Sequence, residues 1–506
     1  MSMFIRKKKN KSGSITVQIL HKHQGKNHII KTVGTSNDDQ EIGSLYQQAQ
    51  VLIPELFNQL SLYKEESPKV GVIKMLNNDD IRVVGPDIIF GRIFDKLGFN
   101  AIPDELFKDL AISRITHPGS KLKLAEYLQE NGKQNIQVDR IYRFLDKLNT
   151  KYKSQVEEIS FIHTKKLLGG KIGVVFYDMT TIYFESSQPD DFRMTGFSKD
   201  GKHNHSQIYL GLLVGVNGYP IGYEIFEGNT YEGHTLIPVL QRFQSRFELD
   251  KPIVVADAGL LSTDNLNKLI ANGYTFILGA RIKNESKHII QKIMNLNLAD
   301  GQIGQIDKDD QTILYISYSN KRAMKDASNR ERGLKRLEKS LNAGRLTKSN
   351  INNRGYNKYL KIEGDIKIEI NYDKFYDDAR WDGLKGYVTN TDIPGTQVID
   401  SYKNLWKIEK AFRISKTDLK IRPIYHRLRD RIEAHICISF VSYVLYKELE
   451  NVLYEYKSNI SIAKAIEVTK KIYEITITDD NNIKRHIRLK NNHTQQEILN
   501  IIDSEF

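Results

Sequence analysis

The stretch KIGVVFYDMTTIYFE, residues 171–185, decides the fold prediction for this chain. Val, Ile, Tyr and Phe dominate it, and residues of these types are enriched in β-strands. One carboxylate, Asp178, lies in the middle of this apolar run. A charge in such a place is costly unless it is paired or binds a metal ion. The stretch therefore predicts a buried strand that carries a functional acid.

The segments that follow residue 185 predict a mixed α/β sheet. Residues 207–229 predict a strand–turn–strand unit around Asn217-Gly218, and residues 233–247 predict a helix that Thr235 caps. A strand, a helix and a strand follow at residues 252–259, 262–273 and 274–281. A tight Asn-Gly turn makes the first strands antiparallel neighbours, and helical connections make the later ones parallel. Three strands, helix, strand, helix, strand is the order of a ribonuclease-H-like domain, with a mixed five-stranded sheet and helices.

The remaining sequence predicts further domains, because 506 residues exceed one ordinary core. We divide the chain into a basic arm with a β-hairpin and a helix, a mainly helical region, the first part of the sheet domain, an insertion with a helical hairpin and some strand, the second part of the sheet domain, and a C-terminal region. Their limits are residues 1–66, 67–168, 169–280, 281–385, 386–456 and 457–506.

Composition bounds the class of protein. The net charge is +13 and the pI is near 9.2, and such an excess attracts polyanions. Abundant Lys, Asn and Ile leave codon bias open as another source of this charge. Cys437 is the single cysteine, which excludes an intrachain disulfide and suits a reducing interior. Neither a signal core nor a membrane span is recognisable, so we expect a cytoplasmic protein without a membrane partner.

A second carboxylate, Asp257, ends the strand segment PIVVA. In α/β sheets, ligands bind at the carboxyl ends of strands. An Asp at such a position is also a common turn or cap residue. Asp257 is therefore a candidate ligand-binding residue on account of its place beside Asp178.

A third carboxylate, Glu409, lies in the cationic stretch NLWKIEKAFRISKTDLKIRP, residues 404–423. On one continuous helix, Tyr402, Trp406, Glu409, Arg413 and Lys416 share a face. Such a face presents Glu409 to a metal ion and places hydrogen-bonding and cationic groups beside it for phosphates. The alternative is a surface helix with ordinary charge pairing.

Three carboxylates that converge predict Mg²⁺, a hard cation that prefers oxygen ligands, with Mn²⁺ as a substitute. Two such ions can clamp an in-line phosphoryl displacement. No P-loop is present to indicate nucleotide hydrolysis instead.

The chain resembles the DDE transposases of bacterial insertion sequences, in the group with a Tyr-Arg-Glu-Lys signature around the catalytic Glu. The matching segments are YDMTTIYFE, GFSKDGKHNHSQIYLGLLV, EGNTYEGHTL, VVADAGLLS, YKNLWKIEKAFRISKTDLKIRPIYH and RIEAHICISF. The resemblance implies that Asp178, Asp257 and Glu409 are the catalytic and metal-binding triad.

The signature is matched in part. Tyr402 and Lys416 stand where the family has its Tyr and Lys, whereas Leu405 stands where the family has Arg. Arg413, one turn beyond Glu409, is our substitute for that phosphate contact, and Trp406 lies on the same stripe.

The resemblance also implies a reaction and further DNA contacts. Water attack at the element end releases a 3′-hydroxyl, which then attacks target DNA. Trp381 either stacks on a flipped base, as an aromatic of the insertion does in some relatives, or covers a core edge. Apart from the resemblance, Lys202 and His203 are interpreted as part of a solvated loop that contacts the DNA backbone, with a metal site at His203 and His205 as the alternative. The region 67–168 binds the DNA ends by analogy.

The expected partner is double-stranded DNA, as terminal inverted repeats of its own element and as target, bound by a homodimer and without a small-molecule substrate. The resemblance places the protein at the nucleoid of a bacterium. Two alternatives stay open: a ribonuclease-H-like nuclease or resolvase without strand transfer, and a catalytically inactive DNA-binding protein.

Overall fold

The computed structural model describes residues 3–23, 25–64, 80–133, 136–185, 188–247, 250–347, 350–352, 355–363, 367–478 and 484–506. The chain forms two compact units, Met1–Ile81 with Glu474–Arg488, and Arg82–Tyr473 with Leu489–Phe506. The boundary that we predict between residues 66 and 67 lies outside the described residues.

The first unit contains a small antiparallel sheet and a helix. Strands β1 (Met3–Lys9), β2 (Ile15–His23) and β3 (Lys26–Ser36) pair in the order β1-β2-β3, and α1 (Asp39–Lys64) packs against them. The predicted hairpin and helix are confirmed. The basic arm, however, is itself a strand, because its residues pair with β2 from Met3 to Lys9. Strands β15 (Tyr473–Thr478) and β16 (Lys484–Arg488) are antiparallel, and with β4 (Ile81–Val83) they form another sheet in the order β16-β15-β4.

The second unit begins with helices, as the sequence predicts. They are α3 (Gly85–Lys96), α4 (Glu105–Thr116), α5 (Lys121–Glu130), α6 (Val138–Lys147) and α7 (Lys153–Leu167). Side-chain caps define where two of them start, because Asp104 accepts from the N–H of Leu106 and Ser120 from that of Lys123. Helices α3, α4, α6 and α7 pack on α15 (Arg429–Glu455), which is buried over most of its length, and α5 packs on α6.

The large sheet of the second unit has eight strands in the order β10-β11-β14-β9-β8-β5-β6-β7. Their bounds are β5 (Val174–Tyr183), β6 (Gln207–Val214), β7 (Pro220–Glu227), β8 (Ile253–Ala256), β9 (Phe276–Ala280), β10 (Ile303–Asp307), β11 (Ile313–Tyr318) and β14 (Leu384–Thr389). Strands β5, β6 and β7 are antiparallel, and β5, β8 and β9 are parallel. The ribonuclease-H-like order is confirmed, and three antiparallel strands extend the predicted five.

The turn between β6 and β7 confirms the tight turn that the Asn217-Gly218 dipeptide predicts. Asn217 and Gly218 both have positive φ, at 76° and 75°. Two successive positive φ angles are the requirement of the tight hairpin turn that Asn-Gly favours. The antiparallel pairing of β6 and β7 is therefore fixed locally.

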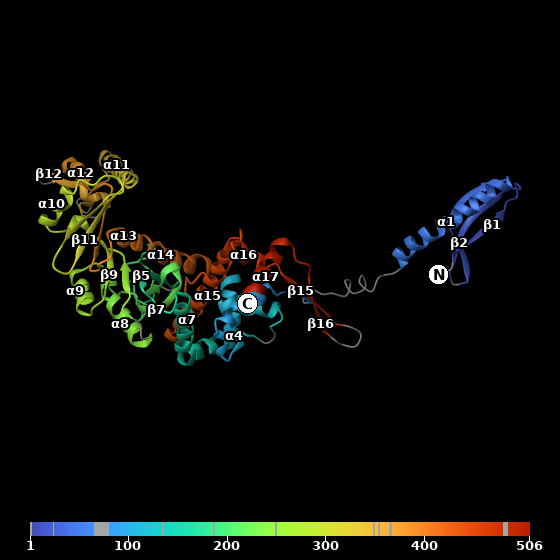
Figure 1. The fold of residues 1–506 in the computed structure, drawn as a ribbon, viewed down its shortest axis with the longest axis horizontal. Helices are drawn as coiled ribbons and strands as arrows, with labels where there is room; N and C mark the ends of the chain where they lie inside the picture. Colours follow the sequence, from blue (N-terminus) through green and yellow to red (C-terminus); the bar gives the residue numbers. More distant parts are fainter. Residues whose placement is uncertain are drawn as a thin grey trace. The chain divides into compact units, whose positions relative to one another are not determined.

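Helices cover both faces of the sheet (Figure 1). Along β5, Val175, Tyr177 and Met179 join the core under α8 (Leu236–Phe247) and α9 (Thr263–Ala271). Phe176 and Ile182 join the opposite core, under α13 (Gly395–Lys403), α14 (Trp406–Arg413) and α15. Because side chains alternate along a strand, Asp178 lies on the α14 face of the sheet.

Residues 281–385 differ from the prediction. They form α10 (Lys287–Asn295), β10, β11, α11 (Asn320–Asn342), β12 (Leu360–Glu363), β13 (Lys367–Ile370) and α12 (Tyr372–Asp377). The predicted helical hairpin is wrong, because its residues form one long helix, α11, that stops at Ala343-Gly344. Strands β10 and β11 belong to the large sheet, while α11, β12, β13 and α12 enclose a small core of their own.

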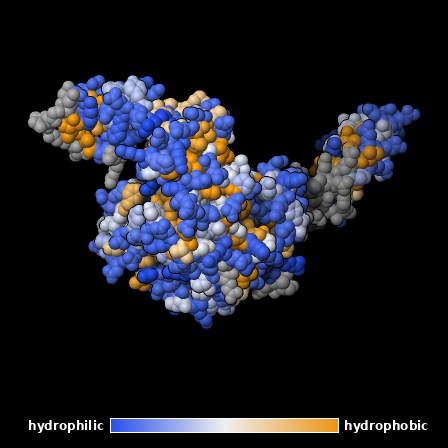
Figure 2. Space-filling model, turned by 60° about the vertical axis from the view of Figure 1, so that its left-hand side comes forward, coloured by the Kyte–Doolittle hydropathy of each residue, from blue (hydrophilic) through white to orange (hydrophobic). Residues whose placement is uncertain are grey.

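The chain ends with α16 (Ile462–Thr469) and α17 (His493–Glu505). In the described part of the chain, no helix combines the length and apolar character needed to cross a bilayer. The face in Figure 2 is mostly hydrophilic, with hydrophobic residues in small areas among hydrophilic ones.

Candidate active site

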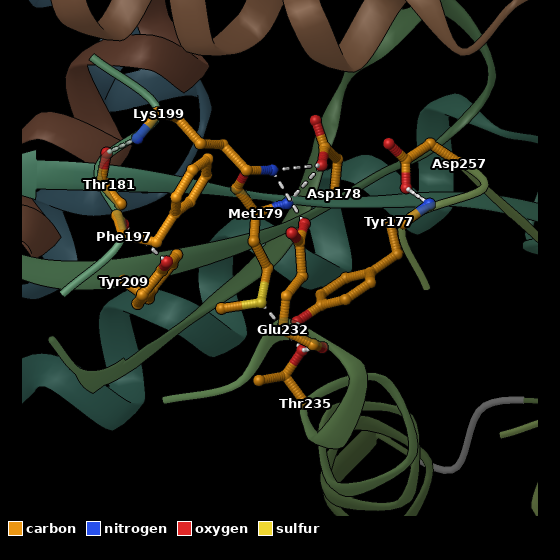
Figure 3. Close-up of polar contacts among 11 residues, drawn as sticks. Tyr177, Asp178, Met179, Thr181, Phe197, Lys199, Tyr209, Glu232, Thr235 and Asp257 are labelled. Carbon is orange, nitrogen blue, oxygen red and sulfur yellow. Dashed lines mark hydrogen bonds and ion pairs between the residues drawn. The ribbon is translucent and has the colours of Figure 1, made fainter. Parts of the chain in front are cut away.

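Asp178 in β5 and Asp257 directly after β8 lie side by side on neighbouring strands in the middle of the large sheet, and we call the place where these two carboxylates meet the acidic edge. The parallel pairing of β5 and β8 ends with Tyr177 opposite Ala256, and each acid is the next residue of its chain segment. An Oδ1 of Asp178 accepts the N–H of Met179 at 2.7 Å, and Oδ1 of Asp257 accepts that of Gly259 at 2.8 Å (Figure 3). The strands thus bring two carboxylates to the edge where parallel strands bind ligands.

The electrostatics of Asp178 reflect this crowding. Burial raises the pKa of Asp178 to about 6, the nearby Asp257 carboxylate adds to the rise, and Lys199 opposes it. The Asp178 side chain is 18% exposed. A carboxylate with a raised pKa is charged at a cost in free energy, which a bound cation would remove.

Lys199 supplies a cation within the protein. Its ammonium donates to the backbone oxygen of Met179 at 2.6 Å, to Oε1 of Glu232 at 2.8 Å and to Oδ1 of Asp178 at 3.4 Å (Figure 3). Burial alone would lower the pKa of Lys199, but Asp178 and Glu232 outweigh it and raise this pKa. Lys199 therefore partly neutralises the acidic edge.

Neighbouring side chains fix the loops that carry Lys199 and Glu232. Thr181 Oγ1 accepts the N–H of Lys199 at 3.1 Å. On the other loop, Thr235 donates to the backbone oxygen of Glu232 at 2.7 Å and accepts from the Tyr177 hydroxyl at 2.9 Å. Our sequence reasoning missed Lys199 and Glu232. Both lie in segments that carry the family resemblance, but as charges in polar loops they have the pattern of solvated residues.

Glu409 approaches from the helix above this edge. Helix α14 packs against β5 through a face that includes the buried Ile408, Ala411 and Phe412, while Glu409 is exposed. The face of β5 that α14 covers is the face on which Asp178 lies.

The Tyr402 hydroxyl lies in the field of all three acids. Burial raises the pKa of Tyr402, and Asp257, Glu409 and Asp178 add to the rise. A Cβ at position 279 would lie 2.5 Å from this hydroxyl, so Gly279 leaves the space that Tyr402 occupies. Tyr402 is therefore a protonated hydroxyl, and a hydrogen-bond donor, between the strand acids and Glu409.

The described residues contain no cluster of three Asp, Glu, His or Cys side chains close enough to hold a metal ion. The acidic edge therefore provides two adjacent carboxylates, with Glu409 outside ligand distance. Paired carboxylate oxygens at strand ends fit a hard divalent cation. Asp178 and Asp257 fit that group as they stand, and Glu409 would join them only after a movement of α14 or of its side chain.

The predicted stripe on one continuous helix is wrong. Helix α13 ends at Lys403, where the Asn404 side chain donates to the backbone oxygen of Asp400 at 3.0 Å, and α14 begins at Trp406. Residues Ile414–Asp418 form a π-helical turn, which changes the angular spacing of the side chains. As a result Tyr402 is buried and Trp406 is 52% exposed.

Lys416 is turned toward another carboxylate. Its ammonium lies 3.0 Å from Oδ2 of Asp200, and Arg422 pairs with the same oxygen. Asp200 is the residue after Lys199. Lys416 is therefore tied to the loop of the acidic edge through Asp200 rather than aligned with Glu409.

The phosphate contact of Arg413, in place of the family Arg at Leu405, stays a prediction. Leu405 is 7% exposed and packs in the core. Arg413 is exposed and lies near Asp418. Burial raises the pKa of Asp418, and the positive charge of Arg413 reduces that rise. A cation that lies beside Tyr402 is Lys385 on β14, whose ammonium is 4.4 Å from the centre of the Tyr402 ring.

The other predicted DNA contacts fall in different environments. Trp381 is 6% exposed and belongs to the core, with the Lys283 ammonium 5.7 Å from its ring, which agrees with the packing interpretation. Its edge lines a cavity of about 620 Å³ that also reaches Tyr402. Lys202 and His203 are exposed, and His203 Nδ1 accepts the N–H of Ser198 at 3.3 Å.

Comparison with known proteins gives one family match. The profile described as "Transposase DDE domain" matches residues 169–445, more than half of the chain. No curated protein matches the sequence significantly.

Two solved structures are similar to parts of the chain. The cryo-EM structure of the piggyBac transposase synaptic complex with hairpin DNA aligns with 9% identity and a TM-score of 0.40, over 72% of this chain and 69% of its own. The Mos1 transposase paired-end complex with left transposon end aligns with 14% identity and a TM-score of 0.16, over 33% of this chain and 56% of its own.

Proposed function

We propose, from the premise that this chain belongs to the family of transposases with a DDE domain and is a DNA transposase, that it cuts DNA at the ends of its element and joins the released 3′-hydroxyl to target DNA. The observation that carries the proposal is the pair Asp178 and Asp257, which follow directly on the last paired residues, Tyr177 and Ala256, of the parallel strands β5 and β8. The matched residues 169–445 include both acids and Glu409.

Asp178 and Asp257 would hold the divalent metal, and Glu409 would complete its ligand set. We expect Mg²⁺, with Mn²⁺ as a substitute and two ions per site, because the donors are carboxylate oxygens. When bound, the ions activate the attacking oxygen and stabilise the leaving oxygen of a phosphoryl transfer. Asp178 must be ionised for this role, so its pKa of about 6 favours metal binding above that pH.

The remaining groups bind and orient the substrate. The Tyr402 hydroxyl stays protonated because burial and the acids raise its pKa, so it can donate to a phosphate oxygen. Lys385, beside the Tyr402 ring, offers a positive charge in the place that Leu405 leaves without one. Lys199 holds Asp178 from the opposite side.

Double-stranded DNA is the proposed partner, as element ends and as target, bound by two protomers. The net charge of +13 supports a large phosphate contribution to affinity. We expect the logarithm of the affinity to fall steeply with the logarithm of the salt concentration. A flat dependence would contradict DNA as the partner.

One experiment separates transposition from hydrolysis. The protein is given Mg²⁺, target DNA and duplexes from the flanks of its own gene, one set already cut to leave a 3′-hydroxyl. Joined products from the pre-cut ends support strand transfer. Cleavage without joining would identify the nuclease or resolvase alternative, and binding without either reaction would identify an inactive DNA-binding protein.

A second experiment tests the acidic edge itself. Asp257→Asn should abolish cleavage and leave DNA binding intact. Asp264→Asn is the control, since Asp264 is an exposed acid of α9 that pairs with Lys268. If Asp257→Asn cleaves DNA as well as the Asp264 variant, the catalytic assignment of Asp257 is wrong.

A further inference from the structure

A second charged site lies away from the acidic edge. A cavity of about 420 Å³ opens between the loop before α5 and the segment that follows α14. Five of the residues that line it are cationic, namely Arg114, Lys121, Lys123, Lys420 and Arg422. None of the described residues that line it is Asp or Glu. The lining of this cavity therefore carries an excess of positive charge.

Two of these cations are buried. Arg114 is 6% exposed and Lys121 is 8% exposed. Arg114 donates to the backbone oxygen of Gly119 at 3.2 Å and contacts the His435 ring, but its Nε has no partner in the described part of the protein. Within the same described residues, no carboxylate lies within 4 Å of the Lys121 ammonium. Burying an unpaired charge is costly, so these groups point to a missing anion.

The pKa values agree with this geometry. Burial lowers the pKa of Arg114 to about 10, and burial also lowers the pKa of Lys121 well below its ordinary value, with Arg114 adding to that effect. An anion between the two side chains would reverse both shifts.

The start of α5 adds polar donors to the cavity. Lys121 is the first residue of this ten-residue helix, and the cap Ser120 accepts the N–H of Lys123. Helix N-termini attract anions through free N–H groups and the helix dipole. Lysine in the first turn has the wrong sign for that dipole, so Lys121 and Lys123 cost stability unless a negative ligand lies beside them.

The opposite wall connects the cavity to the acidic edge. Arg422 pairs with Asp200, which also binds Lys416, and Asp200 follows Lys199 in the chain. Lys199 in turn contacts Asp178. The cavity wall and the acidic edge are therefore linked through the loop that carries Lys199 and Asp200.

Packing alone accounts poorly for these residues. Packing of an aliphatic stem usually keeps a lysine ammonium in open water. Lys121 is only 8% exposed as a residue, and its ammonium lies in the field of the buried Arg114, a repulsion that stem packing does not explain. A structural contact between Arg114 and His435 would account for the burial of these two residues. It would leave Lys121, Lys123 and Lys420 without a reason to gather at the same cavity.

We propose that this cavity binds a backbone phosphate of double-stranded DNA, with Lys121, Arg114 and Lys420 as its contacts. The site anchors the DNA strand at a fixed distance from the reacting phosphate. The identification of the polyanion as DNA rests on the proposed function, while the binding of a phosphate group rests on the cavity alone.

The first test measures DNA binding by the full chain without metal, so that cleavage plays no part. Fluorescence anisotropy with a labelled duplex is followed over a range of salt for wild type, Lys121→Met and Lys420→Met. We expect the Kd to rise about tenfold for each variant, as for a lost charge-assisted hydrogen bond. The slope of log affinity against log salt should fall by about one.

Lys166→Met is the matched control, because Lys166 is exposed near the end of α7 and does not line the cavity. It should change the Kd less than twofold. Equal affinities for the Lys121, Lys420 and Lys166 variants would overturn the proposal. Lys420→Met keeps the test valid if Lys121→Met fails to fold.

The second test uses inorganic pyrophosphate and thermal unfolding. Pyrophosphate should raise the Tm of wild type and of Lys166→Met, and should not raise that of Lys121→Met. If the Lys121 variant loses the pyrophosphate effect but binds DNA normally, the cavity takes a free phosphate and the DNA contact is wrong. A chain that binds DNA through Lys121 but never cleaves it would reject the proposed function and retain this site.

Discussion

The acidic edge and the basic cavity place like charges together in the same unit of the chain, but they differ in how those charges are balanced. At the acidic edge, Asp178 and Asp257 share the neighbourhood of Lys199, an internal cation. At the cavity, the described lining residues around Arg114 and Lys121 include no acid. The first site is partly neutralised by Lys199, whereas in the second the pairing of Arg422 with Asp200 leaves Arg114 and Lys121 without a carboxylate partner among the described residues.

The two charge balances fit two kinds of ligand, a small cation at the acidic edge and a phosphate of a long polyanion at the cavity. A small cation must compete with Lys199 for the Asp178 carboxylate, so the acidic edge can remain folded without metal. A phosphate that arrives as part of a long polyanion brings many other contacts, and its site needs no internal substitute. We therefore expect metal binding to rearrange Lys199 and DNA binding to leave the cavity unchanged.

The largest effect should follow a change at Glu409. Glu409→Gln should lower the cleavage rate about 10³-fold, since one ligand of the metal would be lost, whereas Glu232→Gln should lower it about tenfold through Lys199. Rates are measured on a duplex end under single-turnover conditions. The reverse order would show that Glu232, not Glu409, completes the acidic edge.

The next effect concerns stability and pH at Asp178. Its pKa is 3.8 in its ordinary state and about 6 when folded, so the folded protein holds an extra proton between these values. The unfolding free energy should therefore fall as pH rises from about 4 to 7, by about 3 kcal/mol at most. Asp178→Asn should flatten this part of the denaturation profile and raise stability at pH 7.

Addition of Mg²⁺ supplies the control for that measurement. It should stabilise the wild type at pH 7 and leave Asp178→Asn nearly unchanged, because the ion relieves the same carboxylate repulsion. A variant as sensitive to pH and Mg²⁺ as the wild type would remove Asp178 from the metal site.

A smaller effect is expected at the internal cation. Lys199→Met removes the partner of Asp178 and Glu232 and should lower the unfolding free energy by about 1–3 kcal/mol. The midpoint of Mg²⁺ binding, followed by thermal shift, should move to lower concentration because the competing ammonium is gone. An unchanged midpoint would mean that Lys199 and the metal occupy separate positions.

The smallest effect comes from adding an acid to the basic cavity. Leu122 is 58% exposed in the first turn of α5 and lines the cavity. Leu122→Glu should stabilise the protein by about 0.5–1 kcal/mol through the helix dipole and nearby cations. It should also weaken DNA binding, whereas Leu122→Gln should do neither. If Leu122→Glu lowers the unfolding free energy, the claim that the cavity carries an excess of positive charge is wrong.

Local patterns predicted the parts of the molecule that local physics controls. The apolar run around Asp178 predicted β5, the Asn217-Gly218 dipeptide predicted a tight turn, and the strand–helix order predicted the parallel pairing that sets Asp178 beside Asp257. Each of these depends on a few consecutive residues or on the order of elements.

Contacts between distant segments were not predictable in this way. Lys199 and Glu232 are 33 residues apart, and Arg114 and His435 are 321 residues apart, so no spacing rule brings them together. The break after Lys403 was missed because residues 402–416 keep a helical pattern while Asn404 ends α13 through its side chain. The role of Glu409 stays a prediction, since its approach to the strand acids depends on how α14 is positioned.

The strand order has a consequence for any attempt to shorten or exchange the insertion. Since β11 and β10 follow β14 in the large sheet, deletion of all residues from 281 to 385 would remove part of the sheet and leave an apolar strand edge open to aggregation. A shorter chimera should keep both strands and replace only the segment with its own small core, from α11 to α12. Domain swaps between transposases of this kind are therefore best joined after Tyr318 and before Leu384.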